Sequence, residues 1–190
     1  MENKIDLRVL KTHNKITEAL GSMMSVMTFD SITVYDLCAR AGIRRATFYK
    51  HFNDKFDLLR KVVAVIIENI NKKVISTIDF SNPVEYLINF TNEVIDYFDQ
   101  RPAILKNLIE SSAFPTLLDI IIQCTRQSLV NIFDQAKKQG VNIPISHNVI
   151  ATFINSGIAG VLFEWLVNRD MSREELNQSL EHILKKFFVK

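Results

Sequence analysis

Two short helical patterns joined by a tight turn follow one another from Thr33 onward, and they constrain the fold more than any other feature of the chain. Thr33 can cap the first helix, and Asp36 three residues later completes a capping signal. Gly42 ends this helix, because glycine has no Cβ and adopts the left-handed conformation that such a turn requires. The second pattern covers residues 45–51. Together they predict a helix-turn-helix, a motif whose second helix enters the major groove of DNA.

The outward-facing residues of this stretch are suited to binding nucleic acid. Cations neutralise phosphates, short side chains allow a close approach to base edges, and tyrosine offers a hydroxyl group to the sugar–phosphate backbone. Phe48 and Phe52 are expected to face the core instead. The residues that we expect to contact DNA are Thr33, Arg44, Arg45, Ala46, Thr47, Tyr49, Lys50, His51 and Lys55.

The same stretch closely resembles the TetR family of bacterial one-component regulators. The resemblance covers residues 12–59 as a motif and the rest of the chain as a pattern, and its Thr-Phe-Tyr-x-His-Phe-x-x-Lys core is highly specific. The residues that carry it are Thr33-Val34, Ala41-Gly42-Ile43, Thr47-Phe48-Tyr49, His51-Phe52, Lys55 and Leu58-Leu59.

The resemblance implies two kinds of contact with DNA. Phosphate contacts, which fix the register on the duplex, would come from Thr33, Tyr49, His51 and Lys55. Positions at or near base edges would be held by Arg44, Arg45, Ala46, Thr47 and Lys50. We call the second helix of the motif, which would enter the major groove, the reading helix. In the family the residue before this helix is usually Ser or Asn, whereas here it is Arg44. A cap worth about 1 kcal/mol is then lost and a cation is gained, which can change the preferred DNA sequence.

Charge and cysteine content agree with this interpretation. Lys and Arg outnumber Asp and Glu by ten to seven in residues 1–60, so a modest basic excess accompanies the motif. Cys38 and Cys124 lie in apolar helical patterns and are expected to be buried thiols rather than a disulfide or a metal pair. The N-terminus has no signal-peptide character, and the longest apolar run, residues 62–67, is far short of a membrane span. We therefore expect a cytoplasmic protein without a membrane partner.

Apolar residues recur at helical spacing along the chain, and no strand-like alternation persists. Helix starts are indicated by Asn82 before Pro83, by Ser146, and by the capping box of Ser172 and Glu175. We expect helices over about residues 6–27, 34–41, 45–51, 55–76, 83–98, 102–110, 115–139 and 147–168, and a last one after Ser172. The chain is thus expected to be all-α, with an N-terminal three-helix helix-turn-helix DNA-binding domain (residues 1–54) and a larger helical ligand-binding and dimerisation domain (residues 55–190).

The pattern over residues 147–168 is apolar on an arc too broad for packing on one neighbour. Glycines within a helix cost up to about 1 kcal/mol each, so close helix packing is expected around them. One interpretation is a two-fold interface in which this helix and the last one meet their copies, as the resembled family implies; the other is an intramolecular core helix. The expected interface residues are Phe153, Gly157, Gly160, Val161, Glu164, Leu180 and Leu184.

The helices between residues 83 and 139 are expected to enclose a pocket for an unidentified small-molecule effector, as the resemblance implies. Tyr97 and Trp165 carry a polar tip that needs a partner when buried. The candidate lining residues are Phe90, Tyr97, Phe98, Leu108, Phe114, Gln123 and Trp165. Each of them could equally be an ordinary core residue.

Enzyme function is not expected, because the sequence holds no phosphate-binding glycine loop and no recognisable nucleophile or metal motif. No catalytic residue, metal site or cofactor is predicted. A helical adaptor for other proteins remains the alternative, although it would have no use for the cations beside Tyr49. We therefore expect a sequence-specific transcriptional regulator, a ligand-responsive repressor that binds a palindromic double-stranded operator as a homodimer.

Overall fold

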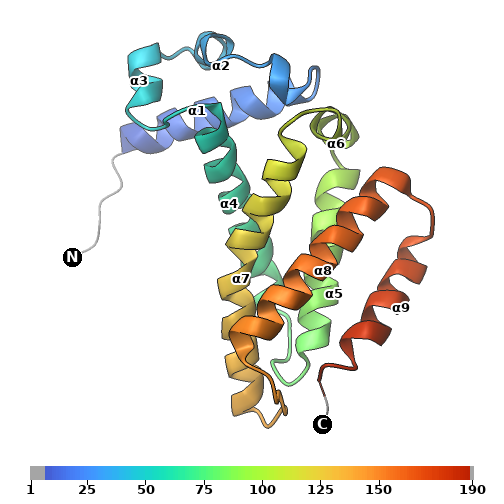
Figure 1. The fold of residues 1–190 in the computed structure, drawn as a ribbon. Helices are drawn as coiled ribbons and strands as arrows, with labels where there is room; N and C mark the ends of the chain where they lie inside the picture. Colours follow the sequence, from blue (N-terminus) through green and yellow to red (C-terminus); the bar gives the residue numbers. More distant parts are fainter. Residues whose placement is uncertain (1–6, 189–190) are drawn as a thin grey trace. The chain divides into compact units, whose positions relative to one another are not determined.

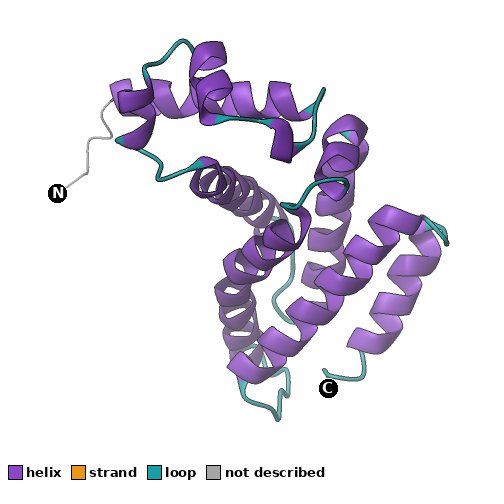
Figure 2. Cartoon of the chain, turned by 45° about the horizontal axis from the view of Figure 1, so that its top comes forward, coloured by secondary structure: helices purple, strands orange, loops and turns teal. Residues whose placement is uncertain are grey.

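The computed structural model describes residues 7–188, and their regular structure is helical (Figure 1). The elements are α1 (Leu7–Met24), η1 (Phe29–Ser31), α2 (Val34–Ala41), α3 (Arg45–Tyr49), α4 (Lys55–Ile75), α5 (Pro83–Asp99), α6 (Pro102–Ile109), α7 (Phe114–Lys138), α8 (His147–Asn168) and α9 (Arg173–Leu184). Figure 2 shows helices and loops, without a strand, over the described part of the chain. The expected all-α class is confirmed. The predicted start of the first helix at residue 6 lies outside the described residues.

Most of the capping signals act as the sequence predicts. The Thr33 side chain accepts a hydrogen bond from the first turn of α2, and Asn82 does the same for α5. Ser172 and Glu175 form a complete capping box at the start of α9. Ser146 stands at the N-cap position of α8, but its side chain makes no capping hydrogen bond.

Contacts divide the chain into two compact units. The first contains the described residues up to Val62 together with residues 101–116, and the second contains residues 63–100 and the described residues from 117 onward. α6 therefore belongs to the first unit, where it packs against α1. Asn107 of α6 donates a hydrogen bond from Nδ2 to the carbonyl oxygen of Met24 at 2.8 Å. The sequence pattern placed all residues after 54 in one domain, because the apolar face of a short helix does not indicate which core receives it.

The core of the first unit is built from aliphatic side chains around buried aromatic rings. Phe29 and Phe48 are both fully buried, and Ile16, Leu37 and Leu58 are buried with them. Phe29 belongs to η1, so the turn between α1 and α2 is anchored in this core. The core thereby fixes the position of α2 and α3.

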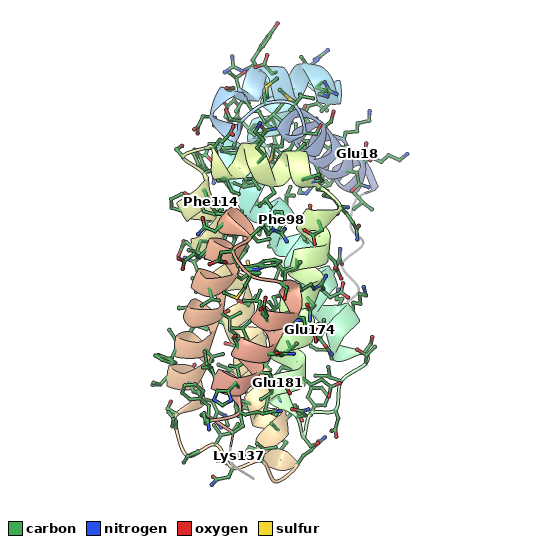
Figure 3. All side chains as sticks on the ribbon, turned by 90° about the vertical axis from the view of Figure 1, so that its right-hand side faces the viewer. Glu18, Phe98, Phe114, Lys137, Glu174 and Glu181 are labelled. Atoms are coloured by element: carbon green, nitrogen blue, oxygen red, sulfur yellow. The ribbon has the colours of Figure 1, made fainter. Side chains whose placement is uncertain are left out.

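The second unit is formed by α5, α7, α8 and α9 with the remainder of α4. α8 and α9 lie side by side and run in opposite directions, drawn in orange and red in Figure 1. Arg173, the first residue of α9, ties this helix to α5: its Nε donates to Asn92 Oδ1 at 2.7 Å and its guanidinium group pairs with Asp96 at 2.6 Å. Figure 3 labels Glu174 and Glu181, two exposed residues of α9.

α8 is the one helix in the described part of the chain that could cross a membrane by length and composition. However, 50% of its apolar stretch is buried inside the protein. A core helix of a helical domain has these same properties.

Candidate nucleic-acid interface

The turn between α2 and α3 has the geometry that its sequence predicts. Gly42 adopts a left-handed conformation with φ of 63°, and the amide of Ile43 donates to the carbonyl oxygen of Cys38 at 3.0 Å. Arg44 then stands extended at the N-cap of α3 without a side-chain capping bond. The expected loss of the cap is therefore confirmed, and the Arg44 guanidinium group is not used for capping.

Buried aromatic side chains pack the reading helix, α3, against the core of the first unit. Phe48 is fully buried and Phe52 is 3% exposed, which confirms their predicted inward orientation. Their ring centroids lie 5.3 Å apart, and the ring of Tyr49 meets that of Phe48 edge-on at 5.4 Å. Tyr49 itself is 50% exposed, so its ring is supported while its outer part faces solvent.

Seven of the predicted DNA-contacting residues lie on one short segment at and after this turn. The exposed ones are Arg44, Arg45, Ala46, Tyr49 and Lys50, and the half-buried ones are Thr47 and His51. The segment thus carries three cations, a small side chain and two hydroxyl groups next to one another. This chemistry suits phosphate oxygens and base edges.

Thr33 is exposed, but its hydroxyl group is already used within the protein. Its Oγ1 accepts from the amide of Asp36 at 3.1 Å and donates to the Asp36 carboxylate at 2.5 Å. A contact between Thr33 and DNA through this hydroxyl group would have to replace the bond to the carboxylate.

Lys55 differs most from its expected role. Its Nζ donates to the carbonyl oxygens of Phe29 at 3.0 Å, Asp30 at 3.1 Å and Ile32 at 2.9 Å. A lysine ammonium group has three donors, so all of them are used inside the protein. No sequence pattern could indicate this arrangement, because the acceptors are backbone atoms more than twenty residues away.

His51 lies against a second histidine that the motif does not include. The ring of His13 on α1 meets that of His51 edge-on, with 5.1 Å between centroids. Lys61 donates to the carbonyl oxygen of His51 at 2.7 Å. Burial, followed by the charges of His51 and Lys61, lowers the pKa of His13 below its ordinary value of 6.5.

Tyr35 is an exposed aromatic residue outside the set of predicted DNA contacts. It lies on α2, two residues after Thr33, and is 67% exposed. A large aromatic side chain on the solvent face of a short helix is the signal that could have identified it, because such a residue contributes little to the core.

The second unit contains a cavity of about 30 Å³ between α5, α7 and α8. None of its lining residues is charged, and its polar members include Thr91, Thr125 and Asn155. Thr125 Oγ1 lies 2.8 Å from Asn155 Oδ1, and Asn155 Nδ2 donates to the carbonyl oxygen of Ile122 at 2.8 Å. These contacts satisfy a polar pair that would otherwise be costly to bury.

Of the predicted pocket residues, one lies at this cavity. Phe90 lines it, whereas Tyr97, Phe98, Leu108, Phe114, Gln123 and Trp165 do not. Leu108 and Phe114 belong to the first unit. The indole Nε1 of Trp165 donates to the carbonyl oxygen of Met171 at 2.9 Å, so its polar tip already has a partner. Spacing along a helix predicts burial but not which neighbour a buried face meets.

The outward face of α8 carries the exposed residues that were expected at an interface. Phe153 is 65% exposed and Val161 is 42% exposed, and Gly157, Gly160 and Glu164 are exposed with them. Leu180 and Leu184 of α9 are only 4% and 3% exposed within the single chain, which corrects their expected place at the interface. They pack into the core of the second unit, while Ile183 between them is 54% exposed.

These features define an all-α protein with a helix-turn-helix DNA-binding motif, joined to a helical C-terminal unit. Models of known families identify both parts. One described as bacterial regulatory proteins of the tetR family matches residues 26–62, and one described as a transcriptional regulator C-terminal region matches residues 85–186. The chain belongs to the TetR family of transcriptional regulators.

Similar proteins agree with this assignment. The chain is 35% identical over 63 residues to the HTH-type transcriptional regulator YxbF of Bacillus subtilis, whose function is uncharacterised; the match covers 33% of this chain and 17% of that protein. The structure of a candidate TetR-family regulator from Syntrophomonas wolfei has 18% identity and a TM-score of 0.68, covering 92% of this chain and 93% of the other. The fatty acid degradation regulator FadR of Bacillus halodurans has 14% identity and a TM-score of 0.63, covering 90% and 96%. At these identities the structures show a shared fold.

Proposed function

We propose that this protein is a sequence-specific repressor in the cytoplasm that binds a palindromic operator as a homodimer and is released by a small effector. The observation that carries the DNA-binding part is the exposed segment of cations and hydroxyl groups at the start of the helix-turn-helix reading helix. Arg44, Arg45, Ala46, Thr47 and Lys50 would lie at base edges. Thr33, Tyr49 and His51 would bind phosphates, with Tyr35 beside them on α2.

The proposed dimer forms through the outward face of α8, with α9 beside it. Its apolar residues, Val149, Phe153 and Val161, recur at helical spacing on either side of Gly157 and Gly160. A Cβ atom added at either glycine would meet nothing within 4 Å, so packing within the single chain does not account for the absence of a side chain. Close approach of a second α8 would account for it, and a two-fold dimer would place two reading helices on two half-sites.

The proposed effector is small, uncharged and largely apolar. Binding a charged molecule in the cavity between α5, α7 and α8 would remove its charge from water without supplying a partner, because no lining residue is charged. A cavity of about 30 Å³ is smaller than a benzene molecule needs, so binding would have to separate the helices. A ligand that favours the separated state shifts the population toward it. Raised thermal stability with benzyl alcohol but not with benzoate would support this chemistry, and a preference for benzoate would contradict it.

The experiment that tests DNA binding is fluorescence anisotropy with the intact protein. The labelled duplex comes from immediately upstream of the protein's own gene and is compared with a scrambled duplex at two salt concentrations. We expect tight binding to the upstream duplex that weakens with salt, and loss of affinity for both duplexes in Tyr49→Ala, because phosphate contacts carry no base information. A folded dimer that binds neither duplex at low salt would contradict the proposed function.

A further inference from the structure

We propose that Lys55 is a positioning residue of the DNA reader and not one of its phosphate contacts. Its ammonium group donates to three carbonyl oxygens of the turn before α2 and thereby fixes this turn to the start of α4. The inference rests on the proposed DNA-binding function and changes the role that the family motif implies for this lysine.

The surroundings of the Lys55 ammonium group leave no donor for a phosphate. Its Nζ lies 3.0, 3.1 and 2.9 Å from the carbonyl oxygens of Phe29, Asp30 and Ile32, and the residue is half-buried. The Phe29 ring centroid lies 4.8 Å from Nζ and that of Phe56 lies 5.9 Å away. Three donors meet three acceptors, and an aromatic face supports the charge. A phosphate contact would require one of these bonds to break.

The carbonyl oxygens bound by Lys55 belong to the turn directly before α2, the first helix of the helix-turn-helix motif. They come from η1 and from Ile32, the residue before the α2 cap Thr33. Within this turn the Phe29 carbonyl oxygen also accepts the amide of Ile32 at 3.2 Å, and the Lys55 ammonium group adds a further donor and a positive charge at the negative end of the local dipole. Lys55 is the first residue of α4, so these bonds connect the start of α4 with the start of α2.

Carboxylates lie at the start of α4, the end of a helix that attracts phosphate. The amide of Asp57 donates to Asp54 Oδ1 at 2.7 Å, and the amide of Asn53 donates to Asp57 Oδ2 at 2.9 Å. The bond from the Asn53 amide, with Lys61 and Arg60 nearby, lowers the pKa of Asp57 below its ordinary value, so this carboxylate stays negative. Helix N-termini attract phosphate through free amides; here the Asp54 carboxylate takes the Asp57 amide, and the Asp57 carboxylate adds a second negative charge at this end of α4.

Two substitutions separate positioning from phosphate binding. The DNA probe is a labelled duplex selected by the wild-type protein from a random 30-base-pair library, so it does not depend on knowing the operator. In Lys55→Met we expect the Kd to rise on the order of tenfold, the Tm to fall, and the slope of log Kd against log salt to stay unchanged. Lys55→Arg keeps the charge, but its planar fork cannot meet three carbonyl oxygens at one point, so it should not restore binding.

Matched lysines serve as controls. Lys50 lies on the exposed segment that is proposed to contact DNA. Lys50→Met should reduce the slope of log Kd against log salt by about one without lowering the Tm. Lys138→Met, at the exposed end of α7, should change none of the three quantities. A salt slope reduced by about one in Lys55→Met, or wild-type binding by Lys55→Arg, would overturn the inference in favour of a phosphate contact. A lowered Tm with an unchanged Kd would overturn it in favour of a purely structural role.

A measurement on the unmodified protein keeps the inference testable if Lys55→Met fails to fold. Amine acetylation followed by mass spectrometry reports which lysines are free. We expect Lys55 to be protected with and without DNA and Lys50 to be protected only by DNA. Protection of Lys55 only in the complex would overturn the proposal. If the wild-type protein selects no sequence from the library, DNA binding itself fails, which is a different result from any of these.

Discussion

His13 gives the first unit a pH-dependent stability at the scale of a single residue. Burial and the neighbouring charges of His51 and Lys61 lower its pKa below 6.5, so the folded protein binds this proton less readily than the unfolded chain. The contribution of neutral His13 to the unfolding free energy is therefore fully present above pH 6.5. It is lost as the pH falls below that value, until His13 is protonated in the folded state as well.

We expect His13→Gln to show a smaller loss of stability between pH 7 and pH 5 than the wild-type protein, measured by chemical denaturation. His182→Gln, at an exposed position on α9, should keep the full loss. The carboxyl groups with lowered pKa, such as Asp30 and Asp96, lose their contribution only at lower pH, below their ordinary value of 3.8. An identical pH profile for His13→Gln and the wild-type protein would contradict the assignment.

At the scale of elements, α3 combines a missing cap with an exposed cation. Arg44 has the extended backbone of an N-cap, with φ of −77° and ψ of 146°, but no capping bond. Arg44→Ser should supply that bond and raise the unfolding free energy by about 1 kcal/mol, while it weakens DNA binding by removing a cation. Thermal unfolding and anisotropy measure the two effects.

Arg45→Ser is the control, because Arg45 is the first residue of α3 and not its N-cap. This variant should weaken DNA binding without the gain in stability. Equal gains in stability in both variants would exclude capping as the cause.

How much could be predicted from the sequence also depends on the element. The caps of α2, α5 and α9 were predictable, because each depends on residues three positions apart. The contacts of Lys55 were not, since backbone oxygens carry no residue-type signal. For α9, the sequence predicts an apolar stripe but not which side of it faces the chain's own core; Leu180 and Leu184 are buried there, whereas Ile183 is exposed.

At the scale of the whole molecule, the proposed homodimer is the main prediction. Phe153→Glu places a charge at the centre of the outward face of α8, where the native side chain is 65% exposed. Burying that charge in an interface would be costly, so we expect the variant to be monomeric in light scattering and to bind a two-half-site duplex no more tightly than a single half-site. Val65→Glu, at another exposed apolar residue (57%), should remain dimeric. A dimeric Phe153→Glu variant would exclude this face.

The place of residues 101–116 in the first unit has a consequence for how this protein can be recombined. Asp30 of η1 accepts hydrogen bonds from the amide of Ser112 at 2.8 Å and from its hydroxyl group at 2.6 Å, and α6 packs on α1. The DNA-binding module is therefore discontinuous along the gene. A chimaera made by joining another regulator's first sixty or so residues to this C-terminal region would keep α6 and Ser112 but replace the surfaces they contact. Exchanging DNA specificity between relatives would accordingly require that the N-terminal segment and residues 101–116 be exchanged together. Point changes in the reading helix are therefore the favoured route to recognition of a new operator.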